Sequence, residues 1–339
     1  MKKEFNKKEK ILILIFIFLF LLVGLITALV LTFENPTPEN HTEVESNSVT
    51  IVVNSSGSEN SSTFIDFDRS LVGYWSMDYY NSTGVYDNSS YNNFGTFKNA
   101  LSISNISTGV RGQGIEFDGV NDYILPSINL TTNLNRQNIT YSYWIKIKKP
   151  YSWMHPIGLW EGHTFTSYIN SVGSLKVKVQ TTTGSIDDAT GDTLSQNVWY
   201  CITQTYNGTN VKVYLNGIET SNDVLNLGNI NTTARTDIMT IGAYPTGAYV
   251  NASLDEVMVF NRTLSNSEIL ALYNSRANKF NVTFNNLSEG QHNYTIWSVD
   301  ESGNFLKELK DFFVDFIKEN LYIKNGHLKI NNGHIKIGS

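Results

Sequence analysis

The sequence predicts an all-β protein built around a two-sheet antiparallel sandwich, and three observations lead to this prediction. Between residues 71 and 275, short β-like runs are separated by turn clusters about every 8–12 residues. Charged residues make up only 17% of the 339-residue chain, whereas Asn, Ser, Thr and aromatic residues are abundant. The single cysteine excludes an internal disulfide framework, so a hydrophobic core has to hold the fold.

The first 33 residues predict a membrane anchor. Residues 1–10 form a basic tail with five lysines, and Ile11–Phe33 is a run of 23 residues without a charge. A helix of that length spans about 34 Å, enough to cross a hydrocarbon core of about 30 Å. Because an excess of lysine stays in the cytoplasm, we expect the N-terminus inside and the rest of the chain outside the cell. A cleaved signal peptide is the alternative, but its apolar region is usually shorter.

Residues 34–70 predict a stalk. They are rich in Glu, Asn, Ser, Thr and Pro, and only Val49–Val53 is typical of a short strand. This composition predicts a mostly disordered, glycosylated linker that holds a head domain away from the membrane. Residues 34–339 contain 20 of the 25 basic and 29 of the 31 acidic residues, a net charge of −9. An acidic exterior repels phosphate backbones, so nucleic acid is excluded as a partner.

Asparagine is the surplus residue, with 40 copies, and many of them lie in the N-glycosylation motif Asn-X-Ser/Thr. Random placement among 63 Ser and Thr residues predicts about seven motifs, whereas the chain has fifteen. An Asn-rich genome is the alternative explanation. We expect a glycosylated exterior, because all fifteen motifs follow the predicted membrane segment. The motifs begin at Asn40, Asn54, Asn60, Asn81, Asn88, Asn105, Asn129, Asn138, Asn207, Asn231, Asn251, Asn261, Asn281, Asn286 and Asn293.

Within residues 71–275 the sequence marks two hairpin turns and one helix. Asn-Gly at 207–208 and at 216–217 suits the positive φ angles of type I′ turns. The residues between these turns alternate apolar and polar, which predicts a strand with one buried face. Ser265 and Glu268 form a capping box ahead of an apolar run, which predicts a short helix.

Seven stretches, in the same order as in a known family, carry a resemblance. They are LVGYWSMD (71–78), VYDNSSYNNFGTF (85–97), GVRGQGIEFDGVNDYI (109–124), YSYWIKI (141–147), NVWYCITQTYNGTNVKVYLNGIE (197–219), MTIGA (239–243) and LDEVMVFNRTLSNSEILALY (254–273). The region 71–275 resembles the laminin-G-like jelly-roll domains of the concanavalin A-like lectin/glucanase superfamily. The resemblance implies a jelly-roll sandwich, a fold that hosts binding, enzymatic and structural roles.

The remaining residues, 276–339, predict a small β segment. The run GQHNYTIWSVDESGN (290–304) resembles the closing strands of an immunoglobulin-like module, which would serve as a spacer. At the end, NGHLKI (325–330) recurs as NGHIKI (332–337). This short repeat predicts either a terminal hairpin or a piece of a longer protein.

The resemblance also implies a structural calcium ion, near the place where the family's first and last strands meet. Asp78, Asp87 and Asp255 match the family's acidic positions, and Asn92 lies in the loop that usually supplies carbonyl ligands. Ca²⁺ takes six to eight oxygen ligands, which such residues provide. The loop lacks the first glycine of the family's pattern, and solvated carboxylates are the alternative interpretation.

Two loops predict ligand contact because they concentrate aromatic rings and histidines. Aromatic rings stack on the C–H faces of sugars, and imidazole groups hydrogen-bond to hydroxyls. We therefore expect Tyr151, Trp153, His155 and His163 to bind the ligand. Trp160 is expected in the core instead.

No enzymatic activity is expected. Glycosidases of the superfamily that this chain resembles carry paired carboxylates on alternate residues of one strand, with the reacting pair about 5 Å apart. The nearest match, Glu116 and Asp118, has Asn121 where the third acid would stand. The expected function is binding of a glycan or an extracellular protein in adhesion or surface recognition. A structural envelope protein and a glycoside hydrolase are the alternatives.

Overall fold

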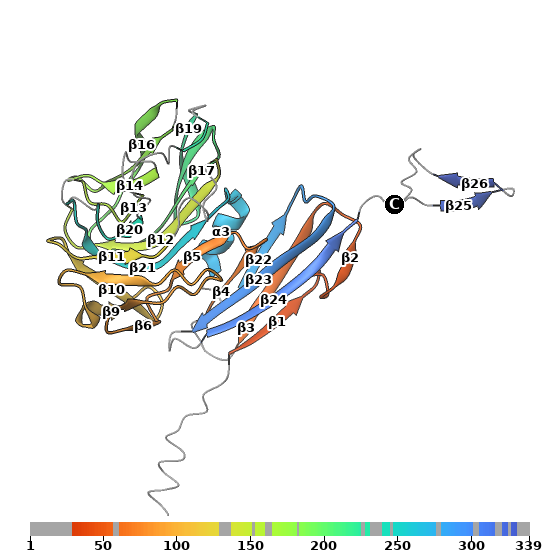
Figure 1. Ribbon diagram of the computed structural model, residues 1–339, viewed down its shortest axis with the longest axis horizontal. Helices are drawn as coiled ribbons and strands as arrows, with labels where there is room; N and C mark the ends of the chain where they lie inside the picture. The colour runs from red at the N-terminus through yellow and green to blue at the C-terminus, as the bar shows by residue number, and fades with distance from the viewer. Residues whose placement is uncertain are drawn as a thin grey trace, which may run out of the picture.

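The computed structural model describes residues 29–330 apart from 57–60, 129–136, 151–152, 160–164, 182, 225–227, 231–238, 245–246, 276–278, 301–304, 316–320 and 325–326. It contains a large and a small β-sandwich, with a short α-helix between them (Figure 1). The predicted all-β sandwich is therefore confirmed.

The large sandwich is a jelly roll with one eight-stranded and one nine-stranded sheet. The eight-stranded sheet has the order β19-β18-β17-β12-β21-β10-β9, and β5 pairs with β21. Its strands are β5 (Leu71–Trp75), β9 (Ile106–Thr108), β10 (Gln113–Asp118), β12 (Ile139–Ile147), β17 (Trp199–Tyr206), β18 (Asn210–Leu215), β19 (Ile218–Val224) and β21 (Asn251–Phe260).

The nine-stranded sheet has the order β16-β15-β14-β13-β20-β11-β8-β7-β6. Its strands are β6 (Tyr80–Asn81), β7 (Gly84–Val85), β8 (Gly95–Lys98), β11 (Tyr123–Pro126), β13 (Ile157–Leu159), β14 (Phe165–Ile169), β15 (Ser174–Gln180), β16 (Ser185–Thr193) and β20 (Met239–Ile241). A 3₁₀ turn, η1 (Ile103–Asn105), precedes β9.

Alternation along the strands builds the core between the two sheets. On β15, Leu175, Val177 and Val179 are fully buried, whereas Lys176 and Lys178 are partly exposed on the outer side. Burying such an apolar side chain contributes about 1.5–3 kcal/mol to folding. Strands of both sheets contribute to this core, which therefore stabilises the sandwich as a whole.

The helix and the turn at 216–217 form as predicted, whereas at 207–208 only Gly208 has a positive φ angle, of 84°, so this turn is not of type I′. Asn216 and Gly217 have φ angles of 52° and 80°, as the turn between β18 and β19 requires. Helix α3 (Asn266–Asn274) begins at the capping box, in which the Glu268 N–H donates to the Ser265 hydroxyl at 3.3 Å and the Ser265 N–H donates to the Glu268 carboxylate at 2.8 Å. This confirms the helix start that the sequence predicts.

The small sandwich is built from two parts of the chain that lie far apart in the sequence. Its sheets have the orders β1-β3-β22 and β2-β24-β23-β4. Strand β3 pairs with β22, and β4 pairs with β23, so early and late strands complete each other. The strands are β1 (Val30–Glu34), β2 (Thr42–Val44), β3 (Val49–Ser56), β4 (Ser61–Phe67), β22 (Lys279–Phe284), β23 (Gly290–Asp300) and β24 (Phe305–Val314).

The predicted disordered stalk at 34–70 is therefore wrong, because this region supplies half of a folded domain. Ile51, Val53 and Phe64 are fully buried in it. Ser and Asn on the same strands hide this role in the sequence. The predicted segment 276–339 is incomplete by itself, since a few strands without an opposing sheet cannot bury their apolar face. The jelly roll is inserted between β4 and β22.

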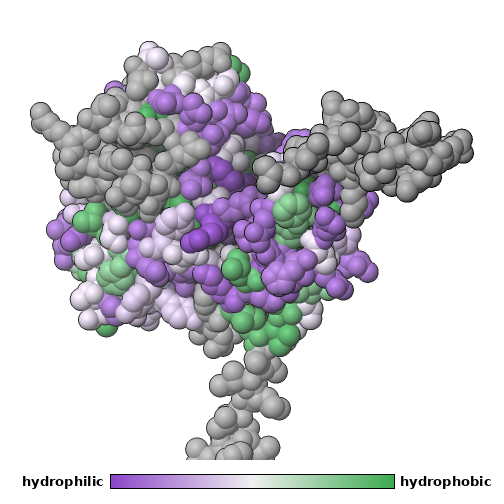
Figure 2. Space-filling model, turned by 45° about the vertical axis from the view of Figure 1, so that its right-hand side comes forward, coloured by the Kyte–Doolittle hydropathy of each residue, from purple (hydrophilic) through white to green (hydrophobic). Residues whose placement is uncertain are grey.

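The predicted membrane span needs a correction at its end. Val30–Glu34 forms β1 and pairs with β3, so residues 30–33 belong to the small sandwich. Residues 1–28, which include the basic tail and most of the span, lie outside the described residues. Within the described part, no helix is both long and apolar enough to cross a membrane. Figure 2 shows hydrophobic surface at the lower end of the small sandwich. Val30 of β1 is 48% exposed.

The two sandwiches share a hydrophobic cluster. The Phe64 ring of β4 meets Tyr74 of β5 edge to face at 5.1 Å and lies parallel to Trp297 of β23 at 6.3 Å. Ile269 and Leu272 of α3 belong to the same cluster. Helix α3 accordingly lies between the jelly roll and β22 (Figure 1). This shared core joins the inserted domain to its host.

A terminal hairpin follows the small sandwich. It pairs β25 (Leu321–Lys324) with β26 (His327–Ile330), which is the described part of the first NGHLKI copy. The second copy lies outside the described residues.

Candidate ligand-binding surface

An aromatic cluster lies on the outer side of the nine-stranded sheet. Trp153 packs against Tyr168 of β14, with ring centroids 5.1 Å apart. The His155 ring lies 5.7 Å from Tyr168 and 5.0 Å from Tyr244. Ile169, the next residue on β14, points into the core, so Tyr168 points away from it. The four rings therefore pack together on the outer side of this sheet, with Trp153 exposed and His155 and Tyr168 buried, and we call them the aromatic cluster.

Trp153 combines exposure with a strained backbone. It is 59% exposed, and its φ angle of 65° lies in the left-handed region that bulky residues rarely adopt. That conformation costs about 1–2 kcal/mol. The adjacent Met154 holds it in place by exchanging two backbone hydrogen bonds with Ile169, at 3.0 and 2.8 Å. Strain of this kind is concentrated at binding and catalytic sites, which makes Trp153 the leading candidate for ligand contact.

Polar side chains surround the aromatic cluster on β14 and β15. Tyr168 lies opposite Lys176, and Thr166 lies opposite Lys178. The Thr166 hydroxyl is 3.1 Å from Nδ1 of His155. The Thr166 hydroxyl is itself buried, so the surface places the exposed Trp153 ring near the ammonium groups of Lys176 and Lys178, and a binding site uses such polar groups to fix the orientation of a ligand.

The structure brings together two of the four predicted ligand contacts. Trp153 and His155 lie in the aromatic cluster, whereas Tyr151 and His163 lie outside the described residues. His155 is only 4% exposed, so it supports the neighbouring rings rather than facing solvent. Sequence reasoning missed Tyr168 and Tyr244. Tyr168 lies in the run FTSYI, where every residue is buried and no alternation marks an outer face.

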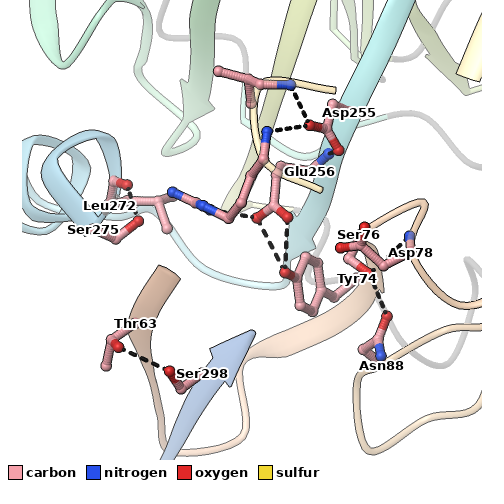
Figure 3. Close-up of polar contacts among 12 residues, drawn as sticks. Thr63, Tyr74, Ser76, Asp78, Asn88, Asp255, Glu256, Leu272, Ser275 and Ser298 are labelled. Carbon is pink, nitrogen blue, oxygen red and sulfur yellow. Dashed lines mark hydrogen bonds and ion pairs between the residues drawn. The ribbon is translucent and has the colours of Figure 1, made fainter. Parts of the chain in front are cut away.

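A second polar cluster lies on the side of the jelly roll that faces α3 (Figure 3). Arg111 Nη1 donates to the Glu256 carboxylate at 2.9 Å, and the Tyr74 hydroxyl donates to the same carboxylate at 3.0 Å. All three residues are buried. Burial raises the pKa of Glu256, and the Arg111 charge opposes this rise. A buried, hydrogen-bonded ion pair of this kind fixes the local structure.

A β-bulge creates the second polar cluster. The register between β21 and β12 shifts beside Glu256, whose φ angle is 52°. Leu254 and Val257 both face the core, three positions apart instead of two, so Asp255 and Glu256 leave the core together. The Asp255 carboxylate accepts the Arg111 N–H at 3.1 Å. Burial, followed by the charge of Glu256, raises the pKa of Asp255 well above its usual range.

The predicted calcium ligands fall in two separate places. Asp78 and Asp255 both hold the loop 109–113, whereas Asp87 and Asn92 lie in the loop after β7. Both oxygens of Asp87 accept hydrogen bonds within that loop, and Asn92 is exposed. Among the residues that the structure describes, no group of three or more acidic, His or Cys side chains is placed to hold a metal ion. The residues as placed do not fit a calcium site, and no function is derived from calcium.

A void beneath α3 is too small for an organic ligand. It measures about 10 Å³, room for about one water molecule, whereas ligand pockets measure about 300–1,000 Å³. The buried Cys201, the one cysteine of the chain, lies in its wall. The lining residues are Arg111, Ser142, Trp144, Cys201, Glu256, Met258, Leu272 and Ser275.

The acids nearest to a glycosidase pattern are held in other contacts. Glu116 forms an exposed ion pair with Lys148. Asp118 accepts a hydrogen bond from the Val120 N–H at 2.7 Å, which closes a tight turn.

The asparagines of the glycosylation motifs are exposed or partly exposed wherever the structure describes them, although the Ser or Thr of some motifs, such as Thr140 and Ser253, is buried. None of their described asparagines is buried, from Asn40 to Asn293. They occur both in turns, as at Asn207, and in strands, as at Asn54 of β3. Asn60, Asn129 and Asn231 lie outside the described residues.

Comparison with known proteins supports the class of domain. Residues 118–270 match the laminin G family described as "Concanavalin A-like lectin/glucanases superfamily". The match and the fold together support a concanavalin A-like domain in the middle of this chain. No curated protein sequence matches the chain.

Two solved structures illustrate the similarity. The binding domain of Paraclostridial Mosquitocidal Protein 1 is 19% identical, with a TM-score of 0.51 over 61% of this chain and 52% of that one. Domain 4 of AbnA, an extracellular arabinanase from Geobacillus stearothermophilus solved in complex with arabinotriose, is 16% identical, with a TM-score of 0.49 over 60% and 98%. The chain thus spans about half of the toxin domain. At these identities the likeness shows the fold alone.

Proposed function

We propose that this protein is a membrane-anchored surface glycoprotein whose jelly-roll domain binds carbohydrate. The observation that carries the proposal is Trp153, whose side chain is 59% exposed and packs on Tyr168 and whose backbone has a strained φ angle. Such a ring offers a flat apolar face to the C–H groups of a sugar, while the partly exposed Lys176 and Lys178 can donate hydrogen bonds to sugar hydroxyls. The match to a superfamily that includes lectins supports the same reading.

The proposed location rests on the N-terminal sequence. A charge-free apolar run begins at Ile11, after five lysines, and suits a signal anchor with its N-terminus in the cytoplasm. The fifteen glycosylation motifs then lie on the outer side. In that location, carbohydrate binding serves adhesion or surface recognition. An extracellular protein is the alternative ligand.

The proposal includes no catalytic step. Glu116 pairs with Lys148 at the surface, and Asn121 replaces the third acid of the glycosidase pattern. We expect no hydrolysis of any glycan that the protein binds. Release of reducing sugar by the wild type that is lost in Glu116→Gln would contradict this.

A glycan array with the full chain tests the proposal. Trp153→Ala should weaken the strongest signal at least tenfold, since removing an aromatic contact of about 1.4 kcal/mol changes affinity by that factor. Trp153→Phe should restore part of it. Phe313→Ala is the matched control, because Phe313 is an aromatic residue with 47% exposure on the small sandwich. It should bind like the wild type.

Two results would overturn the proposal. One is a glycan signal that Trp153→Ala leaves unchanged. The other is the absence of any glycan signal from a wild-type protein that melts cooperatively. Capture of an extracellular protein in place of glycans, lost in Trp153→Ala, would replace carbohydrate by protein as the ligand.

A further inference from the structure

Asparagine is unevenly distributed along the chain. Residues 139–206 make up a fifth of the sequence but contain only two of its 40 asparagines, Asn170 and Asn197, and no glycosylation motif. Ser and Thr are not depleted there, with 17 of the 63 in the chain. Motifs at Asn138 and Asn207 border the stretch on both sides. A general Asn bias of the genome does not explain a gap that spares Ser and Thr.

The motif-free stretch contains three of the four rings of the aromatic cluster, those of Trp153, His155 and Tyr168. Of its strands, β12 and β17 lie inside the eight-stranded sheet, while β13, β14, β15 and β16 lie side by side in the other sheet. On the outer side of β13–β15, Thr166 and Tyr168 are buried against His155 and Trp153. The exposed surface there comprises Trp153, Lys176 and Lys178, and we call it the window. It contains no motif on any of its strands.

We propose that N-linked glycans cover the protein outside the window, and that a polysaccharide chain docks across the window itself. The inference rests on the proposed carbohydrate binding and adds the size and place of the ligand. N-linked glycans are bulky and solubilising, so a surface that carries them is closed to large partners. A free mono- or disaccharide passes between glycans and needs no bare surface. A motif-free surface that extends from Trp153 to the lysines of β15 therefore favours a polymer over a small sugar.

The window can be tested without any ligand. The full chain is produced in a secretory host that attaches N-glycans, and site occupancy is measured by mass spectrometry before and after enzymatic removal of the glycans. The reaction of lysines with a bulky amine reagent then reports shielding. Lys307 is the outside probe, because its Nζ lies 3.1 Å from the hydroxyl of Ser90 in the motif at Asn88. Lys176 and Lys178 are the window probes.

We expect glycan removal to raise the reaction rate of Lys307 at least about threefold, and those of Lys176 and Lys178 by less than about 1.5-fold. If the glycans protect all three lysines equally from the reagent, the proposal that the window is free of glycans is wrong. Unoccupied motifs would overturn the glycan cover. Neither result bears on whether Trp153 binds sugar, so these outcomes are separate from a failure of the proposed function.

The docking step is tested by adding one glycan inside the window and one outside it. Val172→Thr completes a motif at Asn170, which neighbours Trp153 across the backbone pairing of Met154 with Ile169. Val224→Thr completes a motif at Asn222 on β19 in the other sheet. The two changes are chemically identical, and the two valines are similarly exposed, at 70% and 65%. Neither residue belongs to the aromatic cluster.

The probes are immobilised arabinan, mannan and chitin. The glycosylated Val172→Thr protein should lose at least tenfold in retention and regain it after enzymatic deglycosylation, whereas Val224→Thr should bind like the wild type. Unchanged retention of occupied Val172→Thr would overturn docking at the window. If the protein binds short oligosaccharides but none of the three polysaccharides, the proposal of a polymeric ligand is wrong. A protein partner blocked by the same glycan would show that the window binds a protein instead.

Discussion

Asp66 provides a stability prediction at the junction where the chain passes from the small sandwich into the jelly roll. Its carboxylate accepts the Leu71 N–H at 2.9 Å and the Ser70 hydroxyl at 3.0 Å, and it is almost fully buried. Burial outweighs these hydrogen bonds and raises the pKa of Asp66 from 3.8 to about 6. The folded protein therefore binds the proton more tightly than the unfolded chain does.

The size of the effect follows from the two pKa values. A difference of about two units corresponds to about 3 kcal/mol of unfolding free energy. This stabilisation is fully present below pH 3.8 and is lost as the pH rises through 6. Asp66→Asn removes the titration but keeps an oxygen that can accept both hydrogen bonds. Subtracting the variant from the wild type cancels the other titrating groups.

Urea denaturation followed by tryptophan fluorescence measures this difference between pH 4 and pH 7.5. The unfolding free energy of the wild type minus that of Asp66→Asn should fall by about 2–2.5 kcal/mol across this range, because Asp66 of the unfolded chain is already partly ionised at pH 4, and most of the change should lie below pH 6. A difference that does not change with pH would refute the reasoning, because Asp66 would then titrate alike in both states. A difference that rises with pH would contradict the sign.

Three further predictions concern the buried contacts and calcium. Arg111→Met leaves the buried Glu256 carboxylate without its cation and should lower the unfolding free energy by about 3–5 kcal/mol. Lys148→Met, at the exposed pair with Glu116, should change the unfolding free energy by less than about 1 kcal/mol. Equal effects of the two substitutions in urea denaturation would contradict this contrast. Phe64→Ala should cost about 3–5 kcal/mol in calorimetry and keep a single transition, and two separate transitions would show that the sandwiches share no core. EDTA should leave the melting temperature unchanged. A lower melting temperature in EDTA that added Ca²⁺ reverses would show that the protein binds calcium.

The sequence predicts features whose cause is local. The turn at Asn216 and the capping box at Ser265 depend on a few neighbouring residues, and both appear as expected. The composition of its loop predicts Trp153 as a ligand contact, and the Trp153 side chain is exposed in the structure. Its strained φ and its packing on Tyr168 depend on the pairing of Met154 with Ile169, which local composition does not reveal.

Features that depend on long-range pairing escaped prediction. Strand β3 is half polar and its partner β22 is more than 200 residues away, so nothing near Val49–Ser56 indicates a sandwich. The second polar cluster depends on a bulge at Glu256 that turns two adjacent acids out of the core. The four acidic and amide positions matched by family resemblance fall in two places, because Asp78 and Asp255 accept N–H groups of the loop 109–113, whereas Asp87 accepts N–H groups of the loop after β7, where Asn92 also lies.

Hydrogen exchange in the presence of sugar tests carbohydrate binding at the aromatic cluster most directly. Mass spectrometry follows amide exchange of the full chain with and without the glycan that gives the strongest array signal. We expect the glycan to slow exchange in peptides that contain Trp153 and strands β13–β15, and to leave β18–β19 and the small sandwich unchanged. Protection confined to those other regions, or no protection at a saturating glycan concentration, would contradict the account.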